Sequence, residues 1–229
     1  MNAAWAGMNT KWIETYRDEL VERYPVLKPL SKDFYDAACI LAGAYTGGKK
    51  LLVCGNGGSA ADADHIVGEL MKSFAIPRPL PEALKQKITQ TDPETGGYIA
   101  GRLQRGYPAI ALTGHSALIS AYANDEDPAL VYAQQVAGYG TPGDVFLGIS
   151  TSGNSRNVTA AALTAKALGL AVLGLTGEDG GKLRAYCDVC LAVPAKETYR
   201  VQELHLPVYH CLCLAVEKTL APLDNWPAV

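Results

Sequence analysis

The sequence predicts an α/β protein, a doubly wound three-layer sandwich built on a five-stranded parallel sheet, with extra helices before the first strand. Short, continuously apolar runs recur along the chain, and each is followed by a stretch with the apolar spacing of a helix. Turns rich in Gly, Ser and Asn come directly after two of these runs. Strands that alternate with helices form parallel sheets covered by helices on both faces.

Two helices are expected before the first strand. The first, Thr10–Tyr24, has apolar side chains at every third or fourth position and ends before Pro25. The second, Lys32–Tyr45, is expected to be capped by Ser31. Because N-terminal helices with apolar faces often pack against a partner subunit, we interpret residues 1–48 as a helical pair for oligomer packing.

The first strand leads into the most informative turn of the chain. Lys50–Cys54 is an apolar run typical of a buried strand. The glycines that follow allow the backbone to come close to a ligand. Ser59 is predicted to cap the next helix, with Asp62 three residues on as in a capping box. The free N–H groups of that first helical turn favour an anion.

His65 and Glu69 follow on the same predicted helix. At positions i and i+4 they share one face, so they form a candidate acid/base or metal-binding pair. Taken alone, the pair is more typical of a structural histidine beside a solvent-facing glutamate. The first strand, turn and helix therefore offer both an anion cradle and a possible reactive pair.

The segment 75–108 interrupts this regular pattern. It is rich in proline and contains the glycine pair 96–97. We interpret it as an insertion or lid over the edge of the fold, with a short helix at 81–90, because loops of this length are usually functional or disordered.

The remainder alternates regularly and completes a single domain, residues 1–229. The later strands are predicted at Ala109–Thr113, Asp144–Ile149, Ala171–Leu175 and Val189–Val193. The later helices are predicted at Ser116–Ala123, Ala129–Val136, Arg156–Leu168, Lys182–Tyr186 and Glu197–Leu220. Gly169 is expected at the position just past the Arg156–Leu168 helix.

A second polar turn, Ser150–Ser155, follows the third strand and is called here the serine turn. It supplies four hydroxyls and a run of backbone N–H groups in front of a helix, which suits a phosphate held by neutral donors. It contains no lysine, so it is not a Walker loop. The alternative is a simple helix cap, which needs only one such hydroxyl. Ligands bind at this end of the strands in open α/β sheets.

Polar side chains also gather in the otherwise apolar last helix. They are Gln202, Glu203, His205 and His210. Gln202 and His210 are eight residues apart, or about two helical turns, so they lie near one face. Because unpaired buried polar groups are costly, such a cluster usually has a partner, often a ligand. For His205 a structural role and a ligand role are equally compatible with the pattern.

Composition excludes several classes of protein. A net charge of −3 gives no reason to expect nucleic acid as a partner, and no apolar run reaches the roughly 18 residues of a membrane span. The six cysteines mostly lie in apolar runs, which predicts reduced thiols and a cytoplasmic protein. Cys187 and Cys190 form a lone CxxC pair at the start of a strand, where a structural role is favoured over zinc.

Four motifs together resemble the sugar isomerase (SIS) fold family, and within it the phosphoheptose (sedoheptulose 7-phosphate) isomerases. They are Cys54–His65, Gly148–Ser155, Leu175–Lys182 and Arg200–His205, with His210 five residues further on. They occur in the family's order, and the resemblance covers nearly the whole chain apart from 75–108.

The resemblance implies an SIS fold, a homotetramer with sites between subunits, and a phosphorylated sugar as substrate. It implies Zn²⁺ as cofactor, with His65, Glu69, Gln202 and His210 as the metal ligands. Glu69 and His210 match the family's base and acid. The positions implied in substrate binding are Asn56, Gly57, Ser59, Ser150, Thr151, Ser152, Ser155, His115 and Gln202.

Two positions depart from the family's pattern near the sugar hydroxyls. Gly114-His115 stands where the family usually has an aspartate, and Tyr199 replaces an aspartate that some members carry before the Arg200 motif. These departures leave open an isomerase of a different phosphosugar. A non-catalytic SIS adaptor that binds a replication initiator protein is the other alternative.

Overall fold

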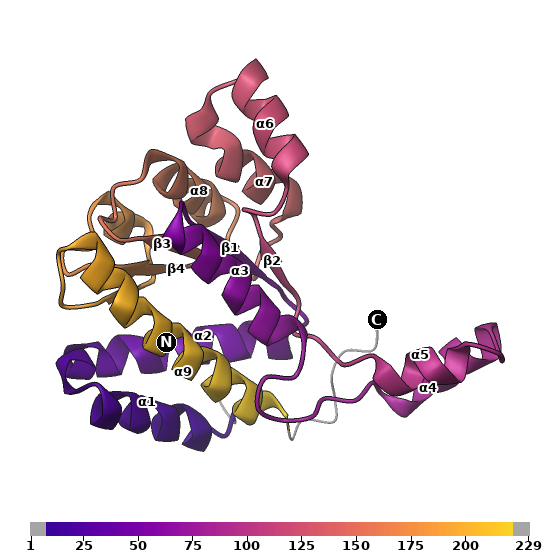
Figure 1. The fold of residues 1–229 in the computed structure, drawn as a ribbon. Coiled ribbons are helices and arrows are strands. Elements are labelled where there is room, and N and C mark those ends of the chain that lie inside the picture. Colours follow the sequence, from indigo (N-terminus) through magenta and orange to yellow (C-terminus); the bar gives the residue numbers. More distant parts are fainter. Residues whose placement is uncertain (1–7, 222–229) are drawn as a thin grey trace.

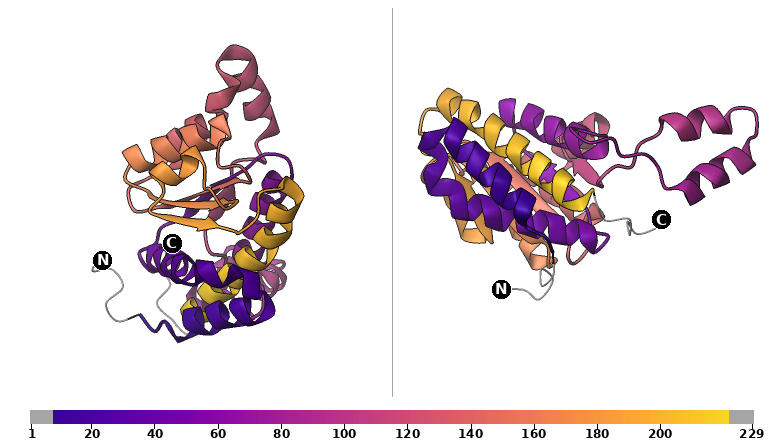
Figure 2. Two further views of the ribbon diagram at one scale, coloured as in Figure 1. Left: turned by 90° about the vertical axis from the view of Figure 1, so that its left-hand side faces the viewer. Right: turned by 90° about the horizontal axis from the view of Figure 1, so that it is seen from below.

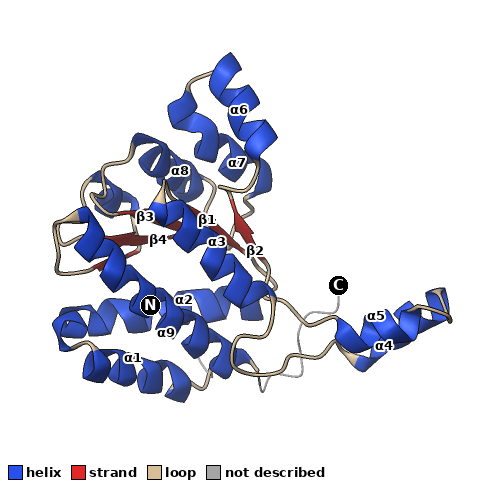
Figure 3. Cartoon of the chain, in the orientation of Figure 1, coloured by secondary structure: helices blue, strands red, loops and turns tan. Residues whose placement is uncertain are grey.

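The structure, a computed structural model, describes residues 8–221 and contains a central parallel sheet with helices on both faces (Figures 1 and 3). The strands are β1 (Leu51–Cys54), β2 (Ala109–Ala111), β3 (Val145–Ser150), β4 (Ala171–Thr176) and β5 (Val189–Ala192). The helices are α1 (Lys11–Arg23), α2 (Ser31–Thr46), α3 (Gly58–Met71), α4 (Glu82–Thr91), α5 (Gly96–Arg102), α6 (Ser116–Asp125), α7 (Val131–Tyr139), α8 (Arg156–Ala167) and α9 (Thr198–Leu220). Three short 3-10 helices are η2 (Pro25–Leu30), η3 (Pro128–Leu130) and η4 (Lys182–Tyr186). The predicted sheet and its strand positions are confirmed.

The strand order β2-β1-β3-β4-β5 places the reversal of winding between β1 and β3. These two strands pair in parallel, with Cys54 opposite Gly148. The turn after β1 and the serine turn after β3 therefore lie side by side at the carboxyl edge of the sheet. In open α/β sheets this switch point is where ligands bind.

Two apolar cores cover the faces of the sheet. On one face, the odd-numbered residues of β1 and β3 pack with α1, α2, α3 and α9. On the other face, Leu52, Cys54 and Phe146 pack with α7 and α8. The alternation follows from the two-residue period of a strand, and both faces are apolar because both are covered.

The predicted N-terminal helices are both present, but their apolar sides are buried within this chain. Ile13 and Leu20 of α1 and Phe34 of α2 are fully or almost fully buried, and both helices contact α9. The expected Ser31 cap is wrong: Ser31 is the first residue of α2, and its hydroxyl donates to the carbonyl of Lys28. The apolar pattern of 1–48 is thus largely explained without a second subunit. Residues 1–7 of that range lie outside the described part of the chain.

The segment 75–108 forms a helical hairpin of α4 and α5, called here the hairpin, which projects from the body (Figures 1 and 2). The helix predicted at 81–90 is confirmed as α4, whereas α5 was not predicted. An antiparallel bridge between Pro79 and Gln104 closes its base. Because α3 runs back from the carboxyl edge, the hairpin leaves from the amino edge of the sheet. It therefore does not cover the serine turn of its own chain.

Other local predictions are also resolved. Gly169 lies just past α8 with φ of +78°, as expected for that position.

Between residues 8 and 221, no helix combines the length and the apolar character that crossing a membrane needs. All six cysteines are free, and the Sγ atoms of Cys187 and Cys190 both lie over Gly174 of β4. The CxxC pair is therefore packed against the sheet, in agreement with a structural role.

Candidate functional site

The candidate site lies between α3 and α9, which pack against each other on one face of the sheet. α3 begins at the carboxyl edge after the β1 turn, and α9 begins at the same edge after β5. Both helices then run back toward the amino edge, side by side in the views of Figures 1 and 2. Residues far apart in sequence, at 58–69 and 202–210, are therefore brought together where the two helices pack.

His65 is held by a chain of two polar groups. Its Nδ1 lies 3.0 Å from the hydroxyl of Tyr209, and that hydroxyl donates to Oδ1 of Asp62 at 3.3 Å. Since the single phenolic proton goes to Asp62, the phenolic oxygen accepts from Nδ1–H of His65. In the neutral form of the ring, Nε2 then carries a lone pair. This arrangement resembles the support of metal-binding histidines, which donate their other ring N–H to a fixed acceptor.

The Nε2 of His65 faces both Glu69 and His210. It lies 3.2 Å from Oε1 of Glu69 and 3.4 Å from Nε2 of His210. Burial lowers the pKa of His210, and the charge of a protonated His65 lowers it further. These three side chains are called here the His65 cluster. The fold thus unites three of the residues singled out in the sequence.

The donor atoms of the His65 cluster suit zinc in their chemistry. A carboxylate oxygen and a neutral Nε2 both carry lone pairs, so their contact requires a proton or a cation. The separations of 3.2 and 3.4 Å are near the ~3.3 Å edge of a tetrahedron with ligands at ~2.05 Å. However, within residues 8–221 no three His, Cys, Asp or Glu side chains converge as a finished metal site. The residues therefore fit zinc in their donor atoms and in their pairwise distances, but their donor atoms do not all point at one shared position.

Gln202 lies apart from the His65 cluster. Its side-chain amide packs over Gly58, where a Cβ atom would come within 2.4 Å of its Nε2. Gly58 is the first residue of α3, so the amide sits at the helix N-terminus. From Gly58 to His65 the helix rises about 10 Å. Of the four predicted ligands, Gln202 is therefore the one that the structure associates with the turn after β1.

The serine turn is built mainly by its own backbone and hydroxyls. Ser150 is buried, and its Oγ lies 3.0 Å from Oγ of Ser155. Gly153 adopts φ of +63° and donates its N–H to the carbonyl of Ser150. Asn154 donates from its amide to the carbonyl of Ser152. No basic residue belongs to the turn, so an anion there would be held by neutral donors.

Beside this turn lies a cavity of about 230 Å³. Thr151 and Ser152 line it together with Lys196 and residues 177–179. Lys196 forms a 2.9 Å ion pair with Glu178. Two predicted phosphate-binding residues therefore face open space next to a lysine.

A reciprocal pair of amides joins the turn after β1 to the start of α8, just past the serine turn. Asn56 donates to Asn157 at 2.9 Å, and Asn157 donates to Asn56 at 2.8 Å.

The prediction that Ser59 caps α3 is wrong. Gly57 occupies the N-cap position with φ of +56°, and no side chain caps the helix. Ser59 is instead buried in the first turn of α3, below Gly55.

His115 lies on another element, at the start of α6. Its ring centroid is 5.7 Å from that of Tyr139 on α7. Nearby, Thr113 donates to Asp64 of α3 at 2.6 Å, which ties the end of β2 to the helix that carries His65. His115 stays a predicted substrate-binding residue.

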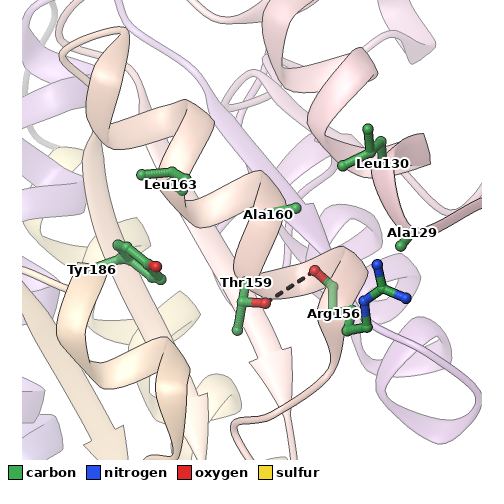
Figure 4. A pocket seen from close by; sticks show the side chains of 7 residues that line it. All are labelled: Ala129, Leu130, Arg156, Thr159, Ala160, Leu163 and Tyr186. Carbon is green, nitrogen blue, oxygen red and sulfur yellow. Dashed lines mark hydrogen bonds between the residues drawn. The ribbon is translucent and has the colours of Figure 1, made fainter. Parts of the chain in front are cut away.

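A separate hollow lies on the opposite face of the sheet, against α8 (Figure 4). Leu130, Leu163 and Tyr186 surround it, and the hydroxyl of Thr159 donates to the carbonyl of Arg156 within its wall. None of the predicted site residues lines it. Its mostly apolar lining offers no set of reactive groups.

His205 proves to be a core residue. It is fully buried, and within residues 8–221 neither ring nitrogen has a well-aligned hydrogen-bond partner. Burial lowers the pKa of His205 to about 4, while the backbone of Thr176 weakly opposes this change. Of the two readings of this residue, the structure favours the structural one.

This burial leads to an expected pH dependence of stability. Between pH 6.5 and 4 the unfolded chain binds a proton at His205 that the folded chain does not, so stability falls as the pH falls. From pH 7 to pH 4 the free energy of unfolding should lose about 3 kcal/mol through this residue. Urea unfolding of the wild type and His205→Leu across this range measures it. Parallel curves for the two proteins would contradict it.

Several site residues were not found from the sequence. Tyr209 and Asn157 contact the predicted site residues His65 and Asn56 across 144 and 101 positions of sequence, and Asp62 accepts a hydrogen bond from Tyr209 across 147. Tyr209 directly precedes His210, and Asp62 lies three residues before His65. Their only signal was this adjacency, because a polar residue beside a motif does not reveal which way it faces.

Comparison with known proteins identifies the family of this chain. The SIS domain family model matches residues 15–95 and 88–177. A phosphoheptose isomerase from Clostridium acetobutylicum is 40% identical over 181 residues, which is 79% of each chain. The solved phosphoheptose isomerase of Francisella tularensis has a TM-score of 0.70 at 30% identity and covers 90% of this chain and 96% of that one. That of Neisseria gonorrhoeae has a TM-score of 0.66 at 32% identity, with 90% and 93% covered. This chain therefore belongs to the SIS domain family and, within it, to the phosphoheptose isomerases.

Proposed function

We propose that this protein interconverts sedoheptulose 7-phosphate and glycero-manno-heptose 7-phosphate as an aldose–ketose isomerase. The observation that carries the proposal is the contact of His65 with both Glu69 and His210. A carboxylate and an imidazole from two helices are thereby brought close together, as proton transfer between adjacent carbons requires. The similarity to phosphoheptose isomerases at 40% identity supports the choice of sugar.

The separation of the two halves of the site also supports an extended substrate. The serine turn lies at the carboxyl edge, and the His65 cluster lies about 10 Å along α3 from the first residue of that helix. A phosphate held at the turns would leave the far end of a long sugar chain at the cluster.

In the proposed reaction, Glu69 removes the proton from the carbon next to the carbonyl. His210 gives a proton to the neighbouring oxygen, or returns one to the second carbon of the enediol. Its lowered pKa makes the protonated ring a better donor. The chain from His65 through Tyr209 to Asp62 holds the imidazole between these two groups in one orientation. The serine turn fixes the phosphate so that the reacting carbons stay in place.

Zinc is the cofactor that we propose, held by His65, Glu69 and His210; Gln202, the fourth predicted ligand, lies apart from these three, over Gly58. When bound, it would polarise a carbonyl oxygen as a Lewis acid. The support is the donor chemistry of the cluster and the hydrogen bond of His65 Nδ1 to Tyr209. A homotetramer with sites shared between subunits is part of the same proposal and rests on the resemblance to the family.

The metal proposal has a direct test. Purified protein is expected to contain about one zinc per chain, as measured by elemental analysis after removal of any affinity tag. The His65→Ala variant should lose it, whereas Cys187→Ala should keep it, which separates the His65 cluster from the CxxC pair. Zinc at the same level in both variants would place the metal elsewhere.

The substrate is tested with a panel of sugar phosphates. We expect sedoheptulose 7-phosphate to give the highest kcat/KM among five-, six- and seven-carbon ketose and aldose phosphates. Each reaction is followed by NMR of its product. Solvent deuterium should enter the product at the carbon next to the carbonyl. A higher kcat/KM for a different sugar would reassign the substrate and keep the isomerase class. No turnover of any of them would favour the non-catalytic adaptor.

A further inference from the structure

A buried ion pair lies where the end of α3 meets the last turns of α9. Arg78 and Glu217 have side chains that are 1% and 2% exposed, and Nε of Arg78 lies 3.0 Å from Oε1 of Glu217. Neither residue was singled out from the sequence. Burying two charges is costly, and the pair is retained only where further hydrogen bonds satisfy it. The other contacts of each partner therefore indicate what the pair does.

Arg78 caps the end of the helix that carries Glu69. Its guanidinium donates to the carbonyl of Leu70 at 2.9 Å and to that of Glu69 at 3.2 Å. α3 ends at Met71 and is followed by Lys72 in an extended conformation, without the glycine that often ends a helix. A cation at these carbonyls replaces that missing cap and opposes the negative end of the helix dipole. The last turn of α3, which contains Glu69, thus depends on Arg78.

Glu217 anchors Arg78 to the helix that carries His210. Glu217 and His210 are seven positions apart on α9, so they lie on one face about two turns from each other. The carboxylate of Glu217 also accepts backbone N–H groups of Phe74, Ala75 and Ile76, at 2.9, 2.7 and 3.2 Å. The segment that follows α3 is therefore fastened to α9 rather than merely packed against it.

We propose that Arg78 is a positioning residue for the reaction, with Glu217 as its anchor: together they set the distance between Glu69 on α3 and His210 on α9. The inference rests on the proposed function, because it assumes that these two side chains transfer the protons. Arg78 touches the backbone of Glu69 and acts through it. A displacement of about 1 Å at such a site costs on the order of 100-fold in rate.

The test compares Arg78→Met with Arg102→Met, which removes an exposed arginine from the hairpin. For Arg78→Met we expect kcat for sedoheptulose 7-phosphate to fall about 10- to 100-fold. Inhibition by inorganic phosphate, which probes the serine turn, should change less than about two-fold. Arg78→Lys keeps the charge but not the planar fork, so it should recover part of kcat. Arg102→Met should match the wild type in both measurements.

Loss of the pair also threatens folding, so each rate is divided by the folded fraction from near-UV circular dichroism at the assay temperature. Glu217→Gln provides a second, milder break, because one of the two carboxylate oxygens of Glu217 is replaced by an NH₂ group, which cannot accept a hydrogen bond. If the pair acts as a unit, the double variant Arg78→Met/Glu217→Gln should have a kcat close to that of Arg78→Met alone. A fall in kcat of the double variant equal to the product of the two single falls would show independent roles and overturn the assignment of Glu217 as the anchor.

The outcomes separate this inference from the function beneath it. Folded Arg78→Met and Glu217→Gln proteins with wild-type kcat would overturn the positioning role, while a loss of activity in Glu69→Gln would leave the isomerase proposal standing. A parallel fall in phosphate affinity and kcat would show a general loss of structure, and it would also overturn the positioning role of Arg78. Full activity of Glu69→Gln would remove the assumption on which the inference rests.

Discussion

Replacement of Glu69 by glutamine is expected to lower kcat by about 10²- to 10⁴-fold, because an amide cannot accept the substrate proton. Glutamine has nearly the same shape, and the serine turn that holds the phosphate is unchanged. KM should therefore stay within about two-fold of the wild type. The measurement is steady-state turnover of sedoheptulose 7-phosphate, with exchange of the substrate proton for solvent deuterium as an independent record of proton removal.

The control is Glu82→Gln, which makes the same chemical change at an exposed position of α4. Its activity and thermal stability should equal those of the wild type. A Glu69→Gln enzyme that still exchanges the substrate proton at the normal rate would show that another group is the base. The neighbouring carboxylates Asp62 and Asp64 would then be the next residues to replace.

The second large effect is expected at Gly153 in the serine turn. Its φ of +63° disfavours any other residue, and an added Cβ would lie 2.0 Å from the carbonyl oxygen of Gly180. The backbone fixes the position of the Cβ, and the oxygen is itself a backbone atom, so neither can rotate away. Gly153→Ala should destabilise the protein by about 2–4 kcal/mol, and folded protein should bind inorganic phosphate more weakly. Urea unfolding and calorimetric titration measure the two effects.

Gly138→Ala is the matched control for Gly153→Ala. Gly138 lies in α7, and nothing is within 4 Å of the position that its Cβ would take. Alanine is the better helix former, so stability should rise by about 0.5–1 kcal/mol. Equal stability changes in the two variants would mean that the serine turn does not depend on the special conformation of Gly153.

The parts that the sequence predicted well depend on local patterns. β1, β3 and the helices behind them follow from apolar runs and from spacing, which act over a few residues. The adjacency of the two turns also follows, since parallel strands end at one edge. His65 and Glu69 could be paired because one helix carries both. His210 joined them only through the resemblance to a known family.

The parts that were missed depend on contacts across the chain. Arg78 and Glu217 meet across 139 positions, and nothing near either residue indicates a partner. α5 was missed because Gly96-Gly97 disfavours a helix, yet the turn from Thr95 and the packing against α4 stabilise one. The cap assigned to Ser59 was wrong because Gly57, with positive φ, starts the helix two residues earlier.

The hairpin has a consequence for how this chain can change. It enters and leaves the body at adjacent points, Pro79 and Gln104, and α4 has no buried residue. Closing such a short gap costs little entropy, so the length and composition of the excursion are almost independent of the stability of the sheet. The residues that must stay fixed are those at its base, where Arg78 joins α3 to α9. The stretch between them can therefore change in length and composition with little effect on the packing of α3 against α9.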